Sequence, residues 1–270
     1  MGQARNFLKC IHLSLLRWSL TKCVLYICGI IIISIMMSKD SYSGLNLDNS
    51  YKIMVITGGH EFDRSFFQIF DSFHDIDYDT LSQPDFNRFL ISNTLDGYEA
   101  LVFYDMWQEI SESEKDAYLN LLNNGMGMVF LHHSLVSYQH WDEFYRIIGG
   151  KYIELEYHDN PNFKGSGYKE DITLDVKIMD KKHPVTYGLS NFNIFDEGYQ
   201  DIEVHPDIHP LLSTSHPDCT PVVAWANHYK NSKIIYILLG HGRQAYENEN
   251  YRKLIKNAIL WVGQEETKYD

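Results

Sequence analysis

The sequence predicts an α/β protein built on a doubly wound, mostly parallel β-sheet. Short apolar runs rich in β-branched residues recur along the chain, as is typical of strands buried on both faces. Helical patterns separate several of these runs, and strands that alternate with helices favour a parallel sheet. The composition is also globular, since 44% of the 270 residues are hydrophobic and 22% are charged, which excludes fibrous and disordered classes.

Four apolar runs are the clearest predicted strands. They are Tyr51–Thr57, which precedes a Gly-Gly pair, Tyr98–Phe103, Met126–Leu131 and Ile234–Leu239. Further strands, some of them antiparallel, are expected around residues 152–158, 171–178, 210–214 and 221–226. These segments belong to one predicted domain, residues 51–264, which is long enough to bury a substantial core.

Three helices are predicted between and after these strands. Phenylalanines at spacings of four, four and three residues indicate a helical face within 61–73. Ser111 and Glu114 form a capping box that opens a second helix, which Asn123-Asn124-Gly125 ends. The last helix shows the strongest pattern, because its apolar residues from Tyr251 to Val262 recur at i, i+3, i+4, i+7, i+8 and i+11.

The first 50 residues differ in kind from this domain. A basic flank, residues 1–22, precedes an uncharged apolar run that we assign to a membrane anchor or signal segment, residues 23–38. An uncleaved N-terminal membrane-targeting helix is favoured because no small-residue cleavage pattern follows, and a cleaved signal is the alternative. Residues 39–50 are a polar linker and 265–270 a tail. Either alternative exports the domain, leaving it membrane-anchored or periplasmic.

Charge and cysteine content exclude several functions. The chain carries 23 Lys and Arg against 36 Asp and Glu, a formal net charge of −13, so nucleic-acid binding through a basic face is excluded. Three of the four cysteines fall in the first 28 residues, and only Cys219 lies in the domain. This distribution excludes a disulfide framework and a cysteine-based zinc site.

Candidate catalytic residues follow the predicted strands, and ligands of open α/β sheets bind at the carboxyl ends of strands. His60, His133 and His241 come directly after three of the strands, and Glu197 follows the segment 192–195. Imidazoles and a carboxylate can shuttle protons, or they can bind a divalent metal such as zinc as cofactor. Both roles stay open for the four residues. His132 is interpreted as a hydrogen-bonded core histidine, because strand alternation points it away from His133.

Five further residues near these strand ends are candidates for substrate binding. Aromatic faces line sugar sites, although ordinary packing is the alternative for each ring. The candidates are Asp105, Trp107, Tyr138, Trp141 and Tyr199.

Nucleophilic catalysis is disfavoured by what stands after the third strand. A cysteine amidotransferase needs a thiolate at the sharp turn after a central strand, and here that turn is His132-His133-Ser134. Ser134 lacks the flanking glycines of a G-x-S-x-G elbow. The sequence therefore indicates neither nucleophile.

Seven ordered motifs resemble the ThuA-like (trehalose utilisation) family over residues 51 to 263. They are Val-Ile-Thr-Gly-Gly-His60, Phe-Tyr-Asp105-Met-Trp107, Leu-His132-His133-Ser-Leu-Val-Ser-Tyr138-Gln-His-Trp141, Ile-Ile-Gly149-Gly150, His183-Pro-Val-Thr-Tyr-Gly188-Leu, Asp196-Glu197-Gly-Tyr199 and Leu-Gly240-His241. The resemblance implies a class I glutamine amidotransferase-like, flavodoxin-like fold without the catalytic cysteine. It also implies a role in carbohydrate metabolism, with a disaccharide such as trehalose or its keto derivative as partner. Members often carry Asp where this chain has Gly242.

Two functions follow from these observations. The first is a sugar-processing hydrolase, lyase or isomerase that uses His60, His133, Glu197 and His241. The second is a non-catalytic carbohydrate-binding or assembly domain anchored at the membrane, for which the high aromatic content of 14% is suited. The sequence leaves the oligomeric state open, a homo-oligomer included.

Overall fold

The computed structural model describes residues 51–157 and 164–264. The predicted membrane segment, residues 23–38, lies outside this part of the chain, together with its flank, the linker and the tail. Among the described residues, no helix combines the length and the apolar character needed to cross a bilayer.

A nine-stranded sheet forms the centre of the molecule, in the order β2-β1-β3-β4-β11-β10-β9-β6-β7. The first five strands in this order are parallel, and the last four pair antiparallel. The strands are β1 (Tyr51–Gly58), β2 (Ile76–Ser82), β3 (Ala100–Asp105), β4 (Gly127–Leu131), β6 (Gly167–Ile178), β7 (Phe192–Gln200), β9 (His209–Ser213), β10 (Val222–Tyr229) and β11 (Ser232–Ile237). Two short strands, β5 (Gly150–Lys151) and β8 (Glu203–Val204), pair separately.

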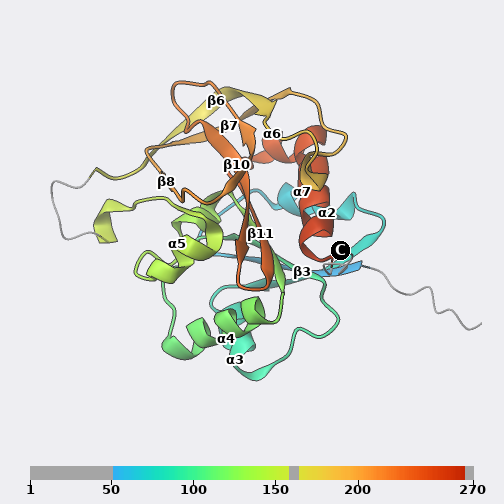
Figure 1. Cartoon of the computed structure of the whole chain (residues 1–270), viewed down its shortest axis with the longest axis vertical. Coiled ribbons are helices and arrows are strands. Elements are labelled where there is room, and N and C mark those ends of the chain that lie inside the picture. The colour runs from blue at the N-terminus through green and yellow to red at the C-terminus, as the bar shows by residue number, and fades with distance from the viewer. Residues whose placement is uncertain (1–50, 158–163, 265–270) are drawn as a thin grey trace, which may run out of the picture. The chain divides into compact units, whose positions relative to one another are not determined.

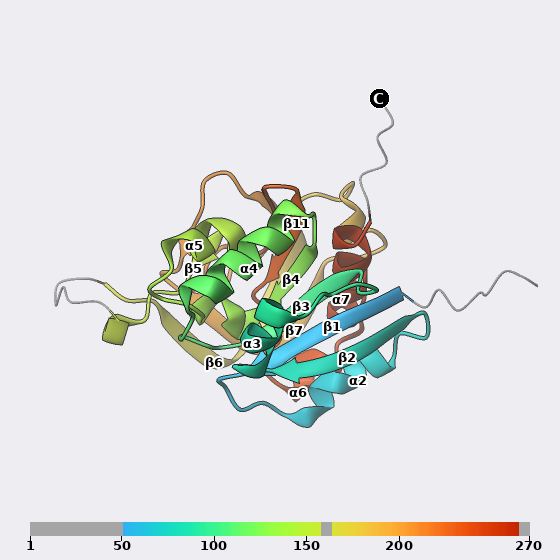
Figure 2. The ribbon, with the colours of Figure 1, turned by 90° about the horizontal axis from the view of Figure 1, so that it is seen from below.

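Helices cover both faces of the parallel part of this sheet. The helices are α2 (Gln68–Asp71), α3 (Asp85–Ser92), α4 (Glu112–Asn123), α5 (Asp142–Ile148), α6 (Arg243–Tyr246) and α7 (Glu249–Val262). Figures 1 and 2 place α3, α4 and α5 on one side of the sheet and α2 and α7 on the other. The predicted α/β fold with a large, mostly parallel sheet is therefore confirmed.

The apolar runs of the sequence supply the core because they lie between these helix layers. Every residue of β3 and β4 is buried, as expected for strands covered on both faces. Helix α7 buries Tyr251, Leu254, Ile255, Ala258, Ile259 and Val262, the residues of its predicted apolar face. The capping box of Ser111 and Glu114 begins α4 as predicted.

Several elements differ from the predictions. The helix expected over 61–73 is reduced to a short 3₁₀ turn, Arg64–Phe67, followed by the single turn of α2. The strand expected around 152–158 is wrong over its described residues, which form a loop and the 3₁₀ turn Leu155–Tyr157. Strand β2 was not predicted, because its sequence alternates with Asp at an exposed edge of the sheet and lacks an apolar run.

The antiparallel part of the sheet curls back over the end of β11. Strand β7 lies four positions from β11 in the sheet order. Even so, the Asp196 carboxylate of β7 accepts hydrogen bonds from the backbone N–H groups of Gly240 and His241, at 2.7 and 2.8 Å. This bend brings β7 to the carboxyl ends of the parallel strands, where ligands of such sheets bind.

Candidate active site

All four predicted catalytic residues line one cavity of about 170 Å³ at the carboxyl ends of the parallel strands. His60 comes from the loop after β1, His133 from the 3₁₀ turn after β4, and His241 from the loop after β11. Glu197 reaches the cavity from β7. The remaining lining residues are Met106, Val136, Tyr152, Glu154, Tyr168, Glu170 and Tyr199.

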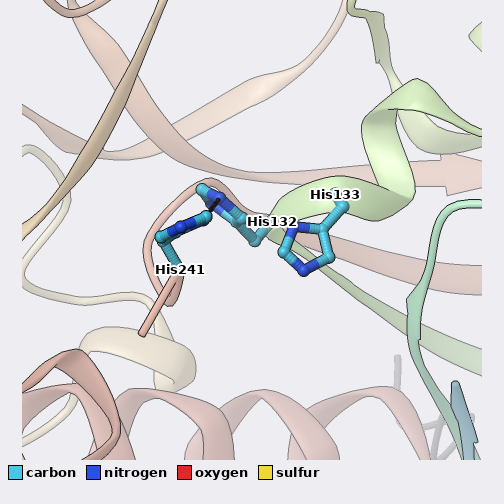
Figure 3. A group of neighbouring side chains, drawn as sticks. All are labelled: His132, His133 and His241. Atoms are coloured by element: carbon cyan, nitrogen blue, oxygen red, sulfur yellow. Dashed lines mark hydrogen bonds between the residues drawn. The ribbon is translucent and has the colours of Figure 1, made fainter. Parts of the chain in front are cut away.

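The imidazole rings form a contiguous cluster. The ring centroids of His60 and His133 lie 4.2 Å apart, and those of His133 and His241 lie 5.9 Å apart. Figure 3 shows His132 beside both His133 and His241, with ring centroids at 4.7 and 5.2 Å. Four histidines from three strand ends therefore share one site.

His132 is the hydrogen-bonded core histidine that the sequence predicted, and it also contacts residues of the site. Its backbone φ of +43° lies in the left-handed region, which non-glycine residues rarely adopt. The ring is fully buried, and its Nδ1 contacts the Leu238 carbonyl oxygen. Its Nε2, however, lies 3.2 Å from Nδ1 of His241 and 3.3 Å from Oε1 of Glu197. The buried His132 thus contacts His241 and Glu197, which line the cavity together with His133.

The Leu238 contact fixes the tautomer of His132. A carbonyl oxygen only accepts, so Nδ1 of His132 carries the hydrogen, and Nε2 of the neutral ring presents a lone pair. Glu197 also presents acceptors there, with Oε2 3.7 Å from Nδ1 of His241. Nδ1 of His241 therefore either donates a hydrogen to these acceptors or shares a cation with them.

Burial controls the protonation of two other rings. Desolvation, followed by the neighbouring histidines, holds the pKa of His133 well below its usual value. Desolvation is also the main cause that lowers the pKa of His241, followed by the repulsion from His132, while Glu197 opposes the shift. Both imidazoles are therefore neutral near pH 7, and Nε2 of His133 is buried with no hydrogen-bond partner among the described residues.

Asp196 positions His241 without reaching the cavity itself. Burial raises the pKa of this carboxyl, while the nearby His132 and the two N–H groups it binds lower it. Tyr104 adds support by donating from its hydroxyl to the Gly240 carbonyl oxygen at 2.7 Å. These bonds hold the loop after β11 in one conformation.

The predicted substrate-binding residues lie in three places. Tyr199 lines the cavity and stacks on His132, with ring centroids 4.7 Å apart. Trp107 and Trp141 line a separate, wider hollow of about 870 Å³. Asp105 and Tyr138 are buried in a polar network in which both contact the side-chain amide of Gln83 at 3.0 Å. Of the five, only Tyr199 joins the histidines.

The buried Asp105 predicts a pH-dependent stability. Desolvation is the largest cause that raises its pKa, to about 6, so the folded state holds its proton more tightly than the unfolded state. Its stabilising contribution is then present below about pH 4 and is lost as the pH rises through 6. The free energy of unfolding of Asp105→Asn, compared with that of the unsubstituted protein, should be about 2–3 kcal/mol higher at pH 7 than at pH 4. Urea denaturation of both proteins at pH 4 and at pH 7 measures this change.

The network can accept that substitution. Oε1 of Gln83 has no hydrogen-bond partner among the described residues, so a reversed Gln83 amide would accept from the new Asn. If the free energies of unfolding of the two proteins changed with pH in the same way, ionisation of Asp105 would not destabilise the fold, and this prediction would be wrong.

Among the described residues that line the cavity, none is a nucleophile of the amidotransferase or serine hydrolase type. Cys219 is buried elsewhere, and burial raises the pKa of its thiol to about 12, which leaves it protonated. Ser134 is fully buried and donates to Asp105 at 3.1 Å. The chemistry of the cavity is therefore that of imidazoles and carboxylates.

In the described part of the chain, two groups of side chains have metal-ligand spacing. Within each group the potential ligand atoms lie within 4.8 Å of one another. The groups are His132, His133 and His241, and Glu170, Glu197 and His241.

Comparisons with known proteins agree with this fold. The family model ThuA, described as trehalose utilisation, matches residues 52–262. A ThuA-like protein from Parabacteroides merdae has a TM-score of 0.66 and 19% sequence identity, over 82% of this chain and 92% of that one. One from Bacteroides uniformis has a TM-score of 0.59 and 21% identity, over 79% and 91%. A cytoplasmic protein from Salmonella typhimurium has a TM-score of 0.55 and 10% sequence identity, over 79% of this chain and 100% of that one. The search of curated proteins gave no match.

Proposed function

Since this chain belongs to the ThuA family of trehalose utilisation, we propose that it is an enzyme that processes a disaccharide or a keto derivative of one. The observation that carries this proposal is the convergence of His60, His133, His241 and Glu197 on one cavity, with His132 buried directly against two of them. Proton-transfer groups brought from separate strand ends to a single pocket are the arrangement that general acid–base catalysis requires.

The cavity suits part of a sugar substrate. Its volume of about 170 Å³ is below the roughly 300–1,000 Å³ of common ligand clefts, so it would hold one sugar ring with the second outside. Tyr152, Tyr168 and Tyr199 provide aromatic walls, and three glutamates provide acceptors for hydroxyl groups.

The roles of the residues follow from their surroundings. His133 is neutral and its Nε2 has no competing hydrogen bond among the described residues, so it serves as the base. The side chain of His241 is 33% exposed at the mouth of the cavity and lies against Glu197, so this pair returns the proton. His132, held by Leu238, orients both partners.

Turnover by histidine variants tests this function. The full chain is incubated with trehalose, other disaccharides and their keto derivatives, and products are followed by chromatography. We expect His133→Ala and His241→Ala each to lower turnover of the accepted sugar at least tenfold. His209→Ala is the control, because this exposed histidine pairs with Asp180 outside the cavity.

Two results would contradict the proposal. Unchanged turnover in both cavity variants would remove the histidines from the chemistry. Saturable sugar binding without any product after long incubation would instead favour the non-catalytic binding or assembly domain.

We also propose that the enzyme works outside the cytoplasm, attached by residues 23–38. The support is the basic flank and the uncharged run that follows it in the sequence. External protease added to spheroplasts should cleave the domain, and protection of the domain until lysis would contradict this location.

A further inference from the structure

Ring nitrogens of three histidines lie close together beside Glu197. His132 has its Nδ1 hydrogen committed to the Leu238 carbonyl oxygen, which leaves Nε2 as the nitrogen that faces His241 and Glu197. Nδ1 of His241 lies 3.2 Å from that atom. His133 brings a third imidazole nitrogen within 4.8 Å of the other two, and its buried Nε2 lacks a hydrogen-bond partner among the described residues.

The spacing of these atoms suits a tetrahedral ion. Zinc bonds of 2.0–2.1 Å place neighbouring tetrahedral ligands about 3.3 Å apart. The separations here are 3.2 Å between His132 and His241, 3.3 Å between His132 and Glu197, and 3.7 Å between His241 and Glu197. The two Glu197 separations involve different oxygens, Oε1 toward His132 and Oε2 toward His241, so the carboxylate spans both rings. A nitrogen of His133 lies within 4.8 Å of nitrogens of the same two rings.

The charge around the cavity also calls for a cation. Glu197 is 5% exposed and lines the cavity with Glu154 and Glu170. No lysine or arginine is among the residues that line it, and the ion-pair partners of Glu197 in the described chain are His132 and His241. A buried carboxylate without a permanent cation is costly, and a divalent ion removes that cost.

The surroundings of the histidines have the form of an outer coordination shell. Ligating histidines in metal sites donate their second N–H to a backbone carbonyl or a carboxylate, which fixes ring and tautomer. His132 does so to Leu238, and Tyr199 stacks on the same ring. Asp196 fixes the backbone of His241 through two hydrogen bonds. The orientations of His132 and His241 are therefore fixed by groups that are not themselves metal ligands.

We propose that this cavity binds one divalent transition-metal ion, with zinc as the preferred ion, through His132, His133, His241 and Glu197. Imidazole nitrogens with one carboxylate are a ligand set that suits zinc. Binding of the ion can be tested without measuring catalysis. With the ion bound, His133, His241 and Glu197 would be ligands rather than proton carriers, and the ion would polarise a sugar oxygen in their place. This use of the ion rests on the function proposed above.

Titration with zinc alone tests the site. The full chain is stripped with a chelator and titrated by calorimetry, and Co²⁺ is added separately as a spectroscopic probe. We expect one zinc per chain and the intense visible absorption of tetrahedral Co²⁺. His133→Ala and His241→Ala should each weaken zinc binding at least tenfold, whereas His209→Ala and His60→Ala should leave it unchanged. Circular dichroism confirms that each variant is folded.

The outcomes separate the two proposals. Absence of saturable binding, or equal affinity in all four variants, would overturn the metal site. Zinc binding with the expected losses but no sugar turnover would support the metal site and contradict the enzymatic function. Turnover that persists in chelated protein that binds no zinc would contradict the metal site and leave the function standing.

Discussion

Glu197→Gln is expected to lower kcat/KM for the sugar substrate by about 10²–10⁴-fold, the usual contribution of a positioned acid–base group. The carboxylate is buried, and its ion-pair partners in the described chain are His132 and His241. The amide has nearly the same shape, but it cannot take up or release a proton. Steady-state kinetics at a fixed pH measures the loss.

The stability of the same variant separates chemistry from folding. Because Glu197 has no lysine or arginine partner among the described residues, removing its charge should not lower the free energy of unfolding. Glu154→Gln is the matched control, since Glu154 lines the same cavity without an ion pair to the histidines. It should retain activity within tenfold. Equal losses in both variants would mean that any glutamate of the cavity serves, and full activity of Glu197→Gln would exclude its catalytic role.

Gly59→Ala should have the largest effect on stability, with a loss of about 3 kcal/mol or more in the free energy of unfolding. Gly59 follows β1 with φ of +81°, and an added Cβ would lie 1.8 Å from the Met106 carbonyl oxygen. The atoms nearest to this added Cβ all belong to the backbone of Met106 and Trp107, so no flexible side chain can move away to relieve the clash. Relief of the clash must separate the ends of β1 and β3, and His60 moves with β1. Urea denaturation measures the loss.

Gly97→Ala isolates the steric part of that effect. Gly97 has a similar φ of +87°, but an added Cβ meets no atom within 4 Å. Its substitution should cost only about 1 kcal/mol, from the left-handed backbone alone. If both variants lost the same amount, the close approach of Met106 would not matter.

The sequence predicted the parallel half of the sheet well, because burial on both faces leaves uninterrupted apolar runs. It also predicted which residues meet, since His60, His133 and His241 each lie within four residues of the end of such a strand. Strand β2 was not predicted because it lies at an exposed edge of the sheet, where the residues need not form an apolar run. Trp107 and Asp105 stand equally close to a strand end, but proximity in sequence does not determine which way a loop side chain points.

His132 shows a second limit of sequence patterns. Alternation along a strand directs neighbours to opposite faces only while the backbone stays extended. At His132 the backbone turns to φ of +43°, so the ring is buried as predicted but contacts His241 and Glu197, which line the cavity. The backbone conformation of the turn after β4 depends on tertiary contacts, so the sequence pattern alone could not reveal the contacts of His132 with His241 and Glu197.

The curl of β7 over the end of β11 divides the site between two parts of the gene. Every histidine of the cluster comes from a loop that follows a parallel strand, whereas Tyr152, Glu154, Tyr168, Glu170, Glu197 and Tyr199 all come from the stretch encoded between β5 and β11. Changes to the lining residues of that stretch, with Asp196 retained to hold the loop after β11, would therefore exchange the walls of the cavity while the imidazoles kept their places. A family with this construction can diversify its specificity by altering one contiguous stretch of chain.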